Sequence, residues 1–248
     1  MSRKKWICFS FALYLLVCLP AGCSRLGVQP APQSKPENGQ QELTYVEKVK
    51  RPPSVYFDLV SALDELFKPL NKMDFTQAQA EYQKALALWE TAKTETGTVK
   101  GVQETDEALK SLGTAIAAGK SQESMAGLNK FANNLQELLT NYKLSPLSDI
   151  VNLAAISRNV SWELADHDFK KAFVRTEELE KTWEQSKTNL EQAGILGEVT
   201  KAHESVDKIK GAVTAENKMA ADSQLKKFNE SLMKIQSFYR QRNQSILP

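Results

Sequence analysis

The sequence predicts an all-α protein made of two tandem copies of a roughly four-helix antiparallel bundle unit. Three observations support this prediction: apolar residues recur at helical spacing, capping residues separate the apolar stretches, and one half of the chain repeats in the other. With 42% hydrophobic and 25% charged residues in 248 positions, the composition is typical of a folded chain.

The apolar residues follow the three-and-four spacing that places side chains along one face of a helix. One stripe consists of Phe75, Ala78, Tyr82, Ala85, Trp89 and Ala92, and another of Ala221, Leu225, Phe228, Leu232, Ile235 and Tyr239. Between such stripes stand Asp74, Gly119 with Ser121, and Ser145 with Pro146, which are typical of helix ends and starts. Short connections of this kind favour antiparallel neighbours.

The two halves of the chain match each other at a nearly constant offset. Asp74, Phe75, Ala78, Trp89, Glu90 and Lys93 recur 94 residues later as Asp168, Phe169, Ala172, Trp183, Glu184 and Lys187. From Gly97 to Tyr142 the matching residues recur 97 residues later, so the second copy has three extra residues, close to one helical turn. This pattern indicates an internal duplication.

We therefore expect helical repeat 1 over residues 54–143 and helical repeat 2 over residues 146–243. The expected helices begin near Ser54, Asp74, Thr98 and Ser121 in the first repeat, and near Pro146, Asp168, Leu196 and Asn217 in the second. Two bundles in tandem is the preferred arrangement. A single core shared by both repeats and a solenoid-like stack are the alternatives that spacing leaves open.

Residues 1–22 have the three parts of a secretory signal peptide. Arg3, Lys4 and Lys5 form the basic start, Trp6 to Leu19 form the apolar stretch, and Ala21-Gly22 are the small residues before the cleavage site. The apolar stretch is short for a spanning helix, which needs about 20 apolar residues. Removal of the three basic residues changes the formal net charge from +2 to about −1. A near-neutral chain offers no broad electrostatic reason to bind nucleic acid.

The segment Leu19-Pro20-Ala21-Gly22-Cys23 resembles the lipobox of bacterial lipoproteins, although Pro20 stands where that pattern has an aliphatic residue. The resemblance implies cleavage between Gly22 and Cys23, acylation of the Cys23 thiol by chains such as palmitate, and a place on the extracytoplasmic face of the cell membrane. Two or more acyl chains give stable anchoring. Cys8 and Cys18 lie in the removable segment, so Cys23 is the one cysteine of the expected mature chain.

After the acylated cysteine, residues 23–53 predict a flexible tether rich in proline. Its prolines are Pro30, Pro32, Pro36, Pro52 and Pro53, among many polar residues. A coil of this length spans on the order of 30 Å, and its extended form about 90 Å. The tether would hold the folded part clear of the lipid headgroups.

The candidate ligand or partner surface consists of Trp89, Lys93, Trp183 and Lys187, because these residues occur in both repeats. The pairing of an Asp-Phe helix start with a later Trp-Glu-x-x-Lys also resembles uncharacterised bacterial membrane-anchored helical domains, a resemblance that implies no activity. Both tryptophans fall on apolar stripes, so core packing is the preferred interpretation for them. Solvated charge is the preferred interpretation for the lysines.

One segment approximates a metalloprotease helix signature. His203-Glu204-Ser205-Val206-Asp207 places Asp207 where that signature has its second histidine, and a catalytic zinc needs a third protein ligand. The first repeat has Asp106, Glu107 and Lys110 at the matching positions, so the pattern does not belong to the shared unit. We expect no enzymatic activity, no metal and no cofactor.

Two function classes remain. The preferred one is a non-catalytic protein-interaction module of the cell envelope that is lipid-anchored and presents helix faces to an envelope protein partner. The alternative is a small-ligand-binding receptor with a pocket in or between the helical bundles, which would need an apolar cavity with a few directed polar atoms.

Overall fold

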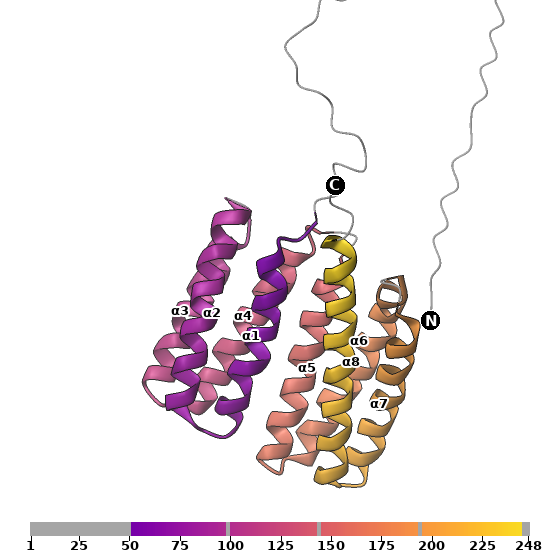
Figure 1. Cartoon of the computed structure of the whole chain (residues 1–248). Helices are drawn as coiled ribbons and strands as arrows, with labels where there is room; N and C mark the ends of the chain where they lie inside the picture. The colour runs from indigo at the N-terminus through magenta and orange to yellow at the C-terminus, as the bar shows by residue number, and fades with distance from the viewer. Residues whose placement is uncertain (1–50, 98–99, 143–144, 193–194, 245–248) are drawn as a thin grey trace, which may run out of the picture. The chain divides into compact units, whose positions relative to one another are not determined.

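The computed structural model describes residues 51–97, 100–142, 145–192 and 195–244, and these residues form helices only. The all-α prediction is therefore confirmed (Figure 1). The helices are α1 (Ser54–Asn71), α2 (Phe75–Thr96), α3 (Val102–Ala117), α4 (Ser121–Leu139), α5 (Leu147–Ala165), α6 (Phe169–Gln192), α7 (Leu196–Thr214) and α8 (Lys218–Gln244). The expected signal peptide of residues 1–22, Cys23 and the tether up to residue 50 lie outside the described residues.

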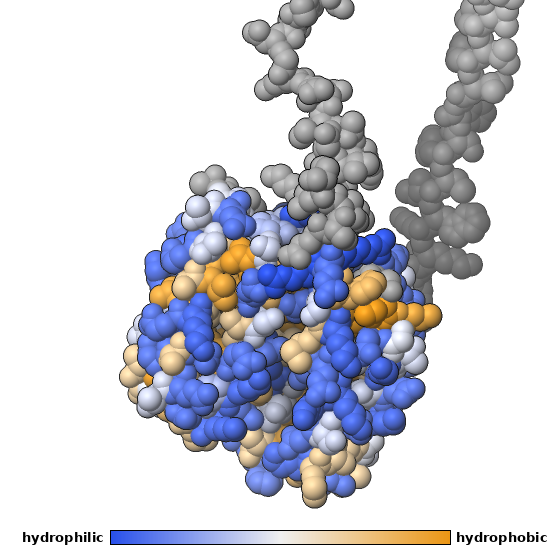
Figure 2. Space-filling view, in the orientation of Figure 1, coloured by the Kyte–Doolittle hydropathy of each residue, from blue (hydrophilic) through white to orange (hydrophobic). Residues whose placement is uncertain are grey.

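The face seen in Figure 2 is mainly hydrophilic, with hydrophobic residues in small groups. Within the described ranges, no helix combines the length and the apolar character needed to cross a membrane. Both apolar stripes of the sequence lie inside: the stripe of α8 is buried throughout, and that of α2 is buried except for the half-buried Phe75.

The duplication is visible in the backbone as well as in the sequence. Met73 and His167 have φ values of 56° and 58°, and they stand at matching positions 94 residues apart. Gly119 and Glu216, 97 residues apart, have φ values of 65° and 52°. Among the described residues, three other than glycine thus adopt the left-handed conformation, which is uncommon outside turns. The same helix-ending turn is used in both repeats.

Helix starts follow the expected chemistry, with one correction. The carboxylate of Asp74 accepts a hydrogen bond from the Gln77 backbone N–H at 3.0 Å, and Asp168 caps α6 in the same way. The helix expected to begin near Thr98 begins four residues later, at Val102. Thr98 itself lies outside the described residues. Gly101 precedes it with φ 97°, a conformation that favours glycine and that a helix cannot include.

Each repeat closes into a four-helix bundle. In the first, consecutive helices pack against each other and α4 returns to α1; in the second, α8 returns to α5 in the same way. The two bundles then meet through α1, α4, α5 and α8, since α4 contacts α5 and α8 contacts α1. The expected tandem bundles are present, and they adjoin along one common face.

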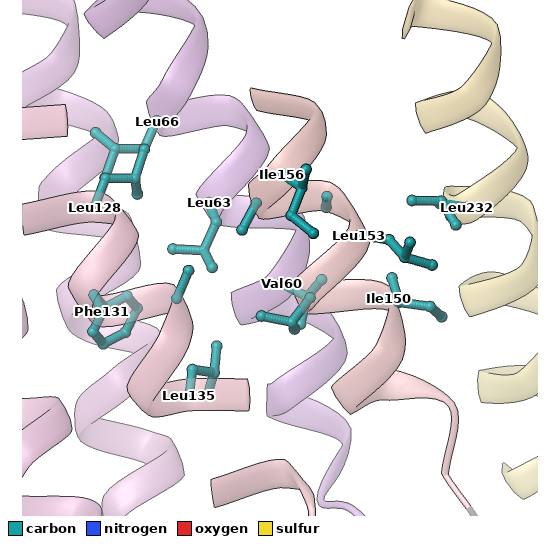
Figure 3. Close-up of a cluster of buried hydrophobic side chains, with 14 of the residues drawn as sticks. Val60, Leu63, Leu66, Leu128, Phe131, Leu135, Ile150, Leu153, Ile156 and Leu232 are labelled. Atoms are coloured by element: carbon teal, nitrogen blue, oxygen red, sulfur yellow. The ribbon is translucent and has the colours of Figure 1, made fainter. Parts of the chain in front are cut away.

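One hydrophobic core runs through both bundles. Figure 3 shows Leu63 of α1 between side chains of α4 and α5, and Leu153 of α5 facing Leu232 of α8. In α5, every residue from Leu153 to Arg158 is buried. Six consecutive buried residues cover every face of a helix, so α5 is surrounded by protein. The alternative of a shared core therefore describes the packing better than two independent cores.

The contact between the bundles joins matching positions. Arg158 of α5 donates from Nη1 to Oδ1 of Asp64 of α1 at 2.5 Å, and the two residues are 94 positions apart, which is the offset of the duplication in this part of the chain. Contact between two counterparts is the arrangement expected near a two-fold axis that relates the two copies. The reciprocal contacts of α4 with α5 and of α8 with α1 agree with such a relation.

The shared core predicts how core substitutions act. Leu59 and Leu153 are matching residues with no exposed surface, so replacing either by alanine should lower the free energy of unfolding by about 2–5 kcal/mol. Each variant should shift a single urea transition of the full chain, followed by circular dichroism and tryptophan fluorescence. Leu196→Ala, at an exposed position, is the control and should change little. A two-phase transition in which only one phase moves would contradict a shared core.

Candidate functional site

The repeated tryptophans occupy the centre of each bundle. Trp89 and Trp183 have no exposed surface. Trp89 meets the edge of Phe131 with ring centroids 5.9 Å apart, and Trp183 meets Phe228, the counterpart of Phe131, at 5.8 Å. Edge-to-face packing of this kind adds to the stabilisation from burial. Neither indole is open to a partner surface.

Each buried indole N–H has a hydrogen-bond acceptor on the following helix. Trp89 donates from Nε1 to Oδ1 of Asp106 at 3.0 Å, and Trp183 donates to Nδ1 of His203 at 3.0 Å. Positions 106 and 203 match at the offset of 97. A buried N–H without an acceptor costs free energy, so both repeats supply one, with different residue types.

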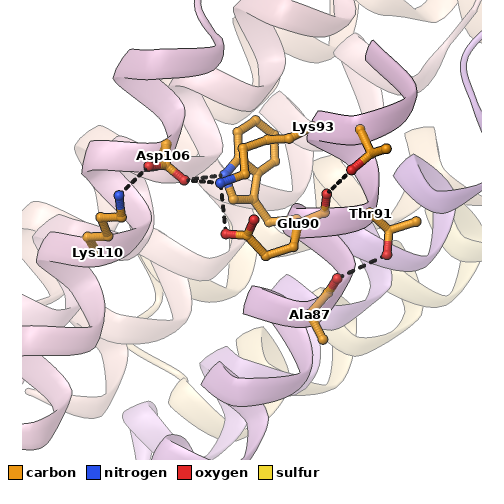
Figure 4. Close-up of polar contacts among 8 residues, drawn as sticks. Ala87, Glu90, Thr91, Lys93, Asp106 and Lys110 are labelled. Carbon is orange, nitrogen blue, oxygen red and sulfur yellow. Dashed lines mark hydrogen bonds and ion pairs between the residues drawn. The ribbon is translucent and has the colours of Figure 1, made fainter. Parts of the chain in front are cut away.

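In the first repeat, the acceptor Asp106 also forms ion pairs with two nearby lysines (Figure 4). Lys93 donates from Nζ to Asp106 Oδ1 and to Glu90 Oε1, each at 2.7 Å, and Lys110 lies 2.6 Å from Asp106 Oδ2. Hydrogen bonds from Lys110 and Lys93 lower the pKa of Asp106 from 3.8 to about 2. Lys93, expected as a solvated charge, is therefore held in a partly buried ion-pair network.

The second repeat has a weaker version of this network around His203. Lys187 lies 3.4 Å from Glu184. His203 Nδ1 accepts the Trp183 hydrogen bond, so it is not a donor to Glu184 Oε1, which lies 3.6 Å away. The metalloprotease-like segment thus uses its histidine as a partner of tryptophan. Within the described ranges, no three His, Cys, Asp or Glu side chains are grouped so that they could hold a metal ion.

The four candidate residues of the sequence therefore form two polar centres, one in each bundle, between α2 and α3 and between α6 and α7. The structure also has a cavity between the bundles, and it is lined by none of Trp89, Lys93, Trp183 and Lys187. Each tryptophan lies in the same polar centre as the lysine of its own repeat, and the two centres are separate.

A cavity of about 490 Å³ lies between α1, α5 and α8. This volume is within the range of small-ligand pockets, roughly 300–1,000 Å³. Phe67, Leu225 and Met233 provide apolar walls. Four basic and three acidic side chains also line the cavity: Lys68, Arg158, Lys218 and Lys226, with Asp64, Asp222 and Glu230. The cavity thus combines three apolar side chains with a lining that is otherwise polar or charged.

Several polar atoms of this lining are buried and lack a hydrogen-bond partner among the described residues. They are Nε and Nη2 of Arg158, Oδ1 of Asn71 and Oδ1 of Asn229. Arg158 is only 2% exposed, and its one hydrogen-bonded nitrogen is the Nη1 that meets Asp64. Unpaired buried donors and acceptors are costly, and because these four atoms have almost no exposed surface, a group in the cavity does not reach them in this conformation.

The polar lining is not a requirement of the fold. The two-fold relation gives each lining residue a counterpart near α4, and there the positions of Lys68, Asp222 and Asn229 hold Trp162, Met125 and Ala132. All three counterparts are buried. At these three positions, the same helix arrangement holds apolar residues on one side and polar residues on the other.

Spacing alone did not reveal this site. Arg158 falls within an otherwise apolar helix, and its partner Asp64 is 94 residues away in the chain. The duplication could have indicated the site. When α1 is aligned with α5, Asp64 matches Arg158 and Lys68 matches Trp162, so the residue types differ at these positions although the helices otherwise match.

The Asp106 network gives a pH-dependent prediction. A carboxylate whose pKa is lowered on folding stabilises the fold above about pH 4, and this stabilisation is lost as pH falls through about 2. Asp106→Asn, which can still accept the Trp89 hydrogen bond, should cost about 1 kcal/mol at pH 7, near the upper range for partly exposed ion pairs. Urea denaturation at pH 7 and pH 2 should show the difference from the unsubstituted protein disappearing at the lower pH. An equal difference at both pH values would contradict this account.

Comparisons of this chain with protein-family models, with curated proteins and with solved structures found no match. The candidate site is therefore defined by the geometry of the chain's own residues.

Proposed function

We propose that the chain is a lipid-anchored, non-catalytic ligand-binding protein of the cell envelope, and that its binding site is the cavity between α1, α5 and α8. The observation that supports the site is a cavity of about 490 Å³ whose lining combines apolar side chains with polar and charged ones from both bundles. Apolar walls with a few directed polar groups are typical of small-molecule sites.

The place in the cell is part of the same proposal. The basic start, the apolar stretch and the lipobox-like end at Cys23 support export, acylation of Cys23 and attachment to the extracytoplasmic face of the cell membrane. The tether between Cys23 and residue 53 would give the bundles freedom to meet ligands away from the lipid surface. The membrane is the partner that the lipid anchor provides, and nucleic acid is not proposed as one.

The interaction module favoured by the sequence has less support than the cavity. Large exposed hydrophobic side chains come from separate places along the chain: Met73, Val174, Leu196, Met219 and Met233. Met233 belongs to the cavity wall. Scattered apolar side chains are ordinary on a protein surface, whereas a contiguous patch marks a partner site. An envelope protein partner therefore remains a separate proposal.

A cavity-filling variant tests the site. Trp162 is the counterpart of Lys68, so Lys68→Trp places on the cavity wall the side chain that the fold accommodates on the other side. The full chain in detergent should bind members of a set of small organic acids, amides and alcohols in ligand-observed NMR, and Lys68→Trp should abolish that binding while the melting temperature stays within a few degrees.

Lys84→Trp, at a solvated position on α2, is the matched control and should bind as the unsubstituted protein does. Binding that survives in Lys68→Trp, or that is lost equally in both variants, would place the ligand elsewhere.

A second variant tests the anchor. Cys23→Ala removes the expected acylation point and should leave an uncleaved, unacylated precursor with lower electrophoretic mobility and no incorporated fatty acid in metabolically labelled bacterial cells. Cys18→Ala, within the removable apolar stretch, is the control and should be processed normally. The lipoprotein assignment fails if Cys23→Ala is still labelled and migrates like the unsubstituted protein.

A further inference from the structure

We propose that the second bundle contains a pH-sensitive switch in which Nδ1 of His203 changes its partner, from the indole of Trp183 to the carboxylate of Glu184. This inference does not rest on the proposed function, because none of the three residues lines the cavity. It depends on one nitrogen atom with two neighbours. Trp183 Nε1 lies 3.0 Å from His203 Nδ1, and Glu184 Oε1 lies 3.6 Å from the same atom.

The two contacts of His203 need opposite protonation states. A neutral imidazole that carries its proton on Nε2 accepts a hydrogen bond at Nδ1, as the bond from Trp183 requires. An imidazolium has an N–H donor at both nitrogens, so it has no acceptor for the indole N–H. Its positive charge is attracted to the carboxylate of Glu184 instead. The same nitrogen can make either contact but not both at once.

The matching centre of the first bundle has no such choice. Asp106 stands at the position that corresponds to His203, and its Oδ1 accepts the Trp89 hydrogen bond at 3.0 Å. Hydrogen bonds from Lys110 and Lys93 lower the pKa of Asp106 to about 2. This carboxylate therefore stays an acceptor over the range from about pH 5 to pH 8, in which imidazole groups ordinarily change charge. One repeat has a fixed acceptor, and the other has an acceptor that protonation removes.

The exchange has consequences because the indole is buried and the imidazole is not. The His203 side chain is 43% exposed, so a proton reaches it from solvent. Trp183 has no exposed surface, stacks on the His203 ring, and meets Phe228 of α8 edge to face. When the acceptor is lost, no water replaces it, and an unpaired buried N–H costs free energy. Protonation of His203 therefore weakens the packing of α6 on α7 around Trp183.

The charges of the packed helices support a change of partner. Glu184 is the carboxylate that forms an ion-pair contact with the imidazole, and Lys187 lies 3.4 Å from it, so an imidazolium would share Glu184 with that lysine. α8 meets the centre through the uncharged ring of Phe228. The other charged side chains of α7 and its contact with α8 are Asp207 one turn beyond His203, Glu204 paired with Lys208, and Glu198 paired with Lys201 and with Lys234 of α8.

The test follows the two indole N–H groups separately. In ¹⁵N-tryptophan-labelled full chain in detergent, the Nε1–H resonance of Trp183 should move upfield between about pH 8 and pH 5, because its hydrogen bond is lost as imidazole gains a proton. The resonance of Trp89 is the internal control and should stay in place, since Asp106 remains an acceptor. Trp183→Phe identifies the resonance. A Trp183 resonance that does not respond to pH would overturn the proposal.

Two histidine variants assign the response to one residue. His203→Asn supplies a side-chain carbonyl that accepts the Trp183 bond and does not titrate, so the pH response of Trp183 should disappear. His167→Asn replaces the other histidine of the chain, at a turn position with φ 58° that asparagine tolerates, and should leave the response unchanged. A response that persists in His203→Asn, or that is lost in His167→Asn, would contradict the role of His203.

Glu184→Gln tests the second partner and does not remove the acceptor of Trp183. Without the carboxylate, the imidazolium loses its counter-charge, so the midpoint of the Trp183 response should move to lower pH. Glu90→Gln, at the matching position of the first bundle, is the control and should leave the midpoint unchanged. An unchanged midpoint in folded Glu184→Gln would show that Glu184 does not receive the imidazolium, and the proposed exchange would fail.

Discussion

The contact between α1 and α5 is the constraint on which the rest of the structure depends. When a duplicated unit meets its own copy near a two-fold axis, each residue at the axis faces its counterpart. A charged residue kept in both copies would then face a like charge in a buried position, which is strongly unfavourable. Asp64 and Arg158 resolve this conflict because the two copies carry opposite charges. The bundles can therefore join through a continuous core, and both residues of the pair line the cavity beside it.

Much of the fold could be predicted because it is encoded locally. Stripes of apolar residues identify the buried face of α2 and α8, and the aspartates at 74 and 168 mark helix starts through a hydrogen bond made within one turn. The arrangement of the bundles is not local. A stripe shows which face is buried but not which helix covers it, and the all-round burial of α5 from Leu153 to Arg158 depends on helices from both repeats.

The candidate sites also differ in how far they could be predicted from the sequence. The tryptophans are evident from their recurrence, but their acceptors are not, because position 106 holds aspartate and position 203 holds histidine and the two share only the ability to accept a hydrogen bond. The cavity depends on contacts over the whole length of the chain. Its signal in the sequence is a difference between the copies, at Lys68 and Trp162, whereas a search for repeats selects what the copies have in common.

The two-fold relation also distinguishes this arrangement from a solenoid. In a solenoid, each unit offers one face to the unit before it and a different face to the unit after it, so growth has no natural limit. Here both copies use the same face, made by the first and fourth helices of each bundle. In the described helices, this face is buried by the contact of the two copies with each other. The assembly is closed by its own geometry, in the manner of a dimer whose subunits have become one polypeptide.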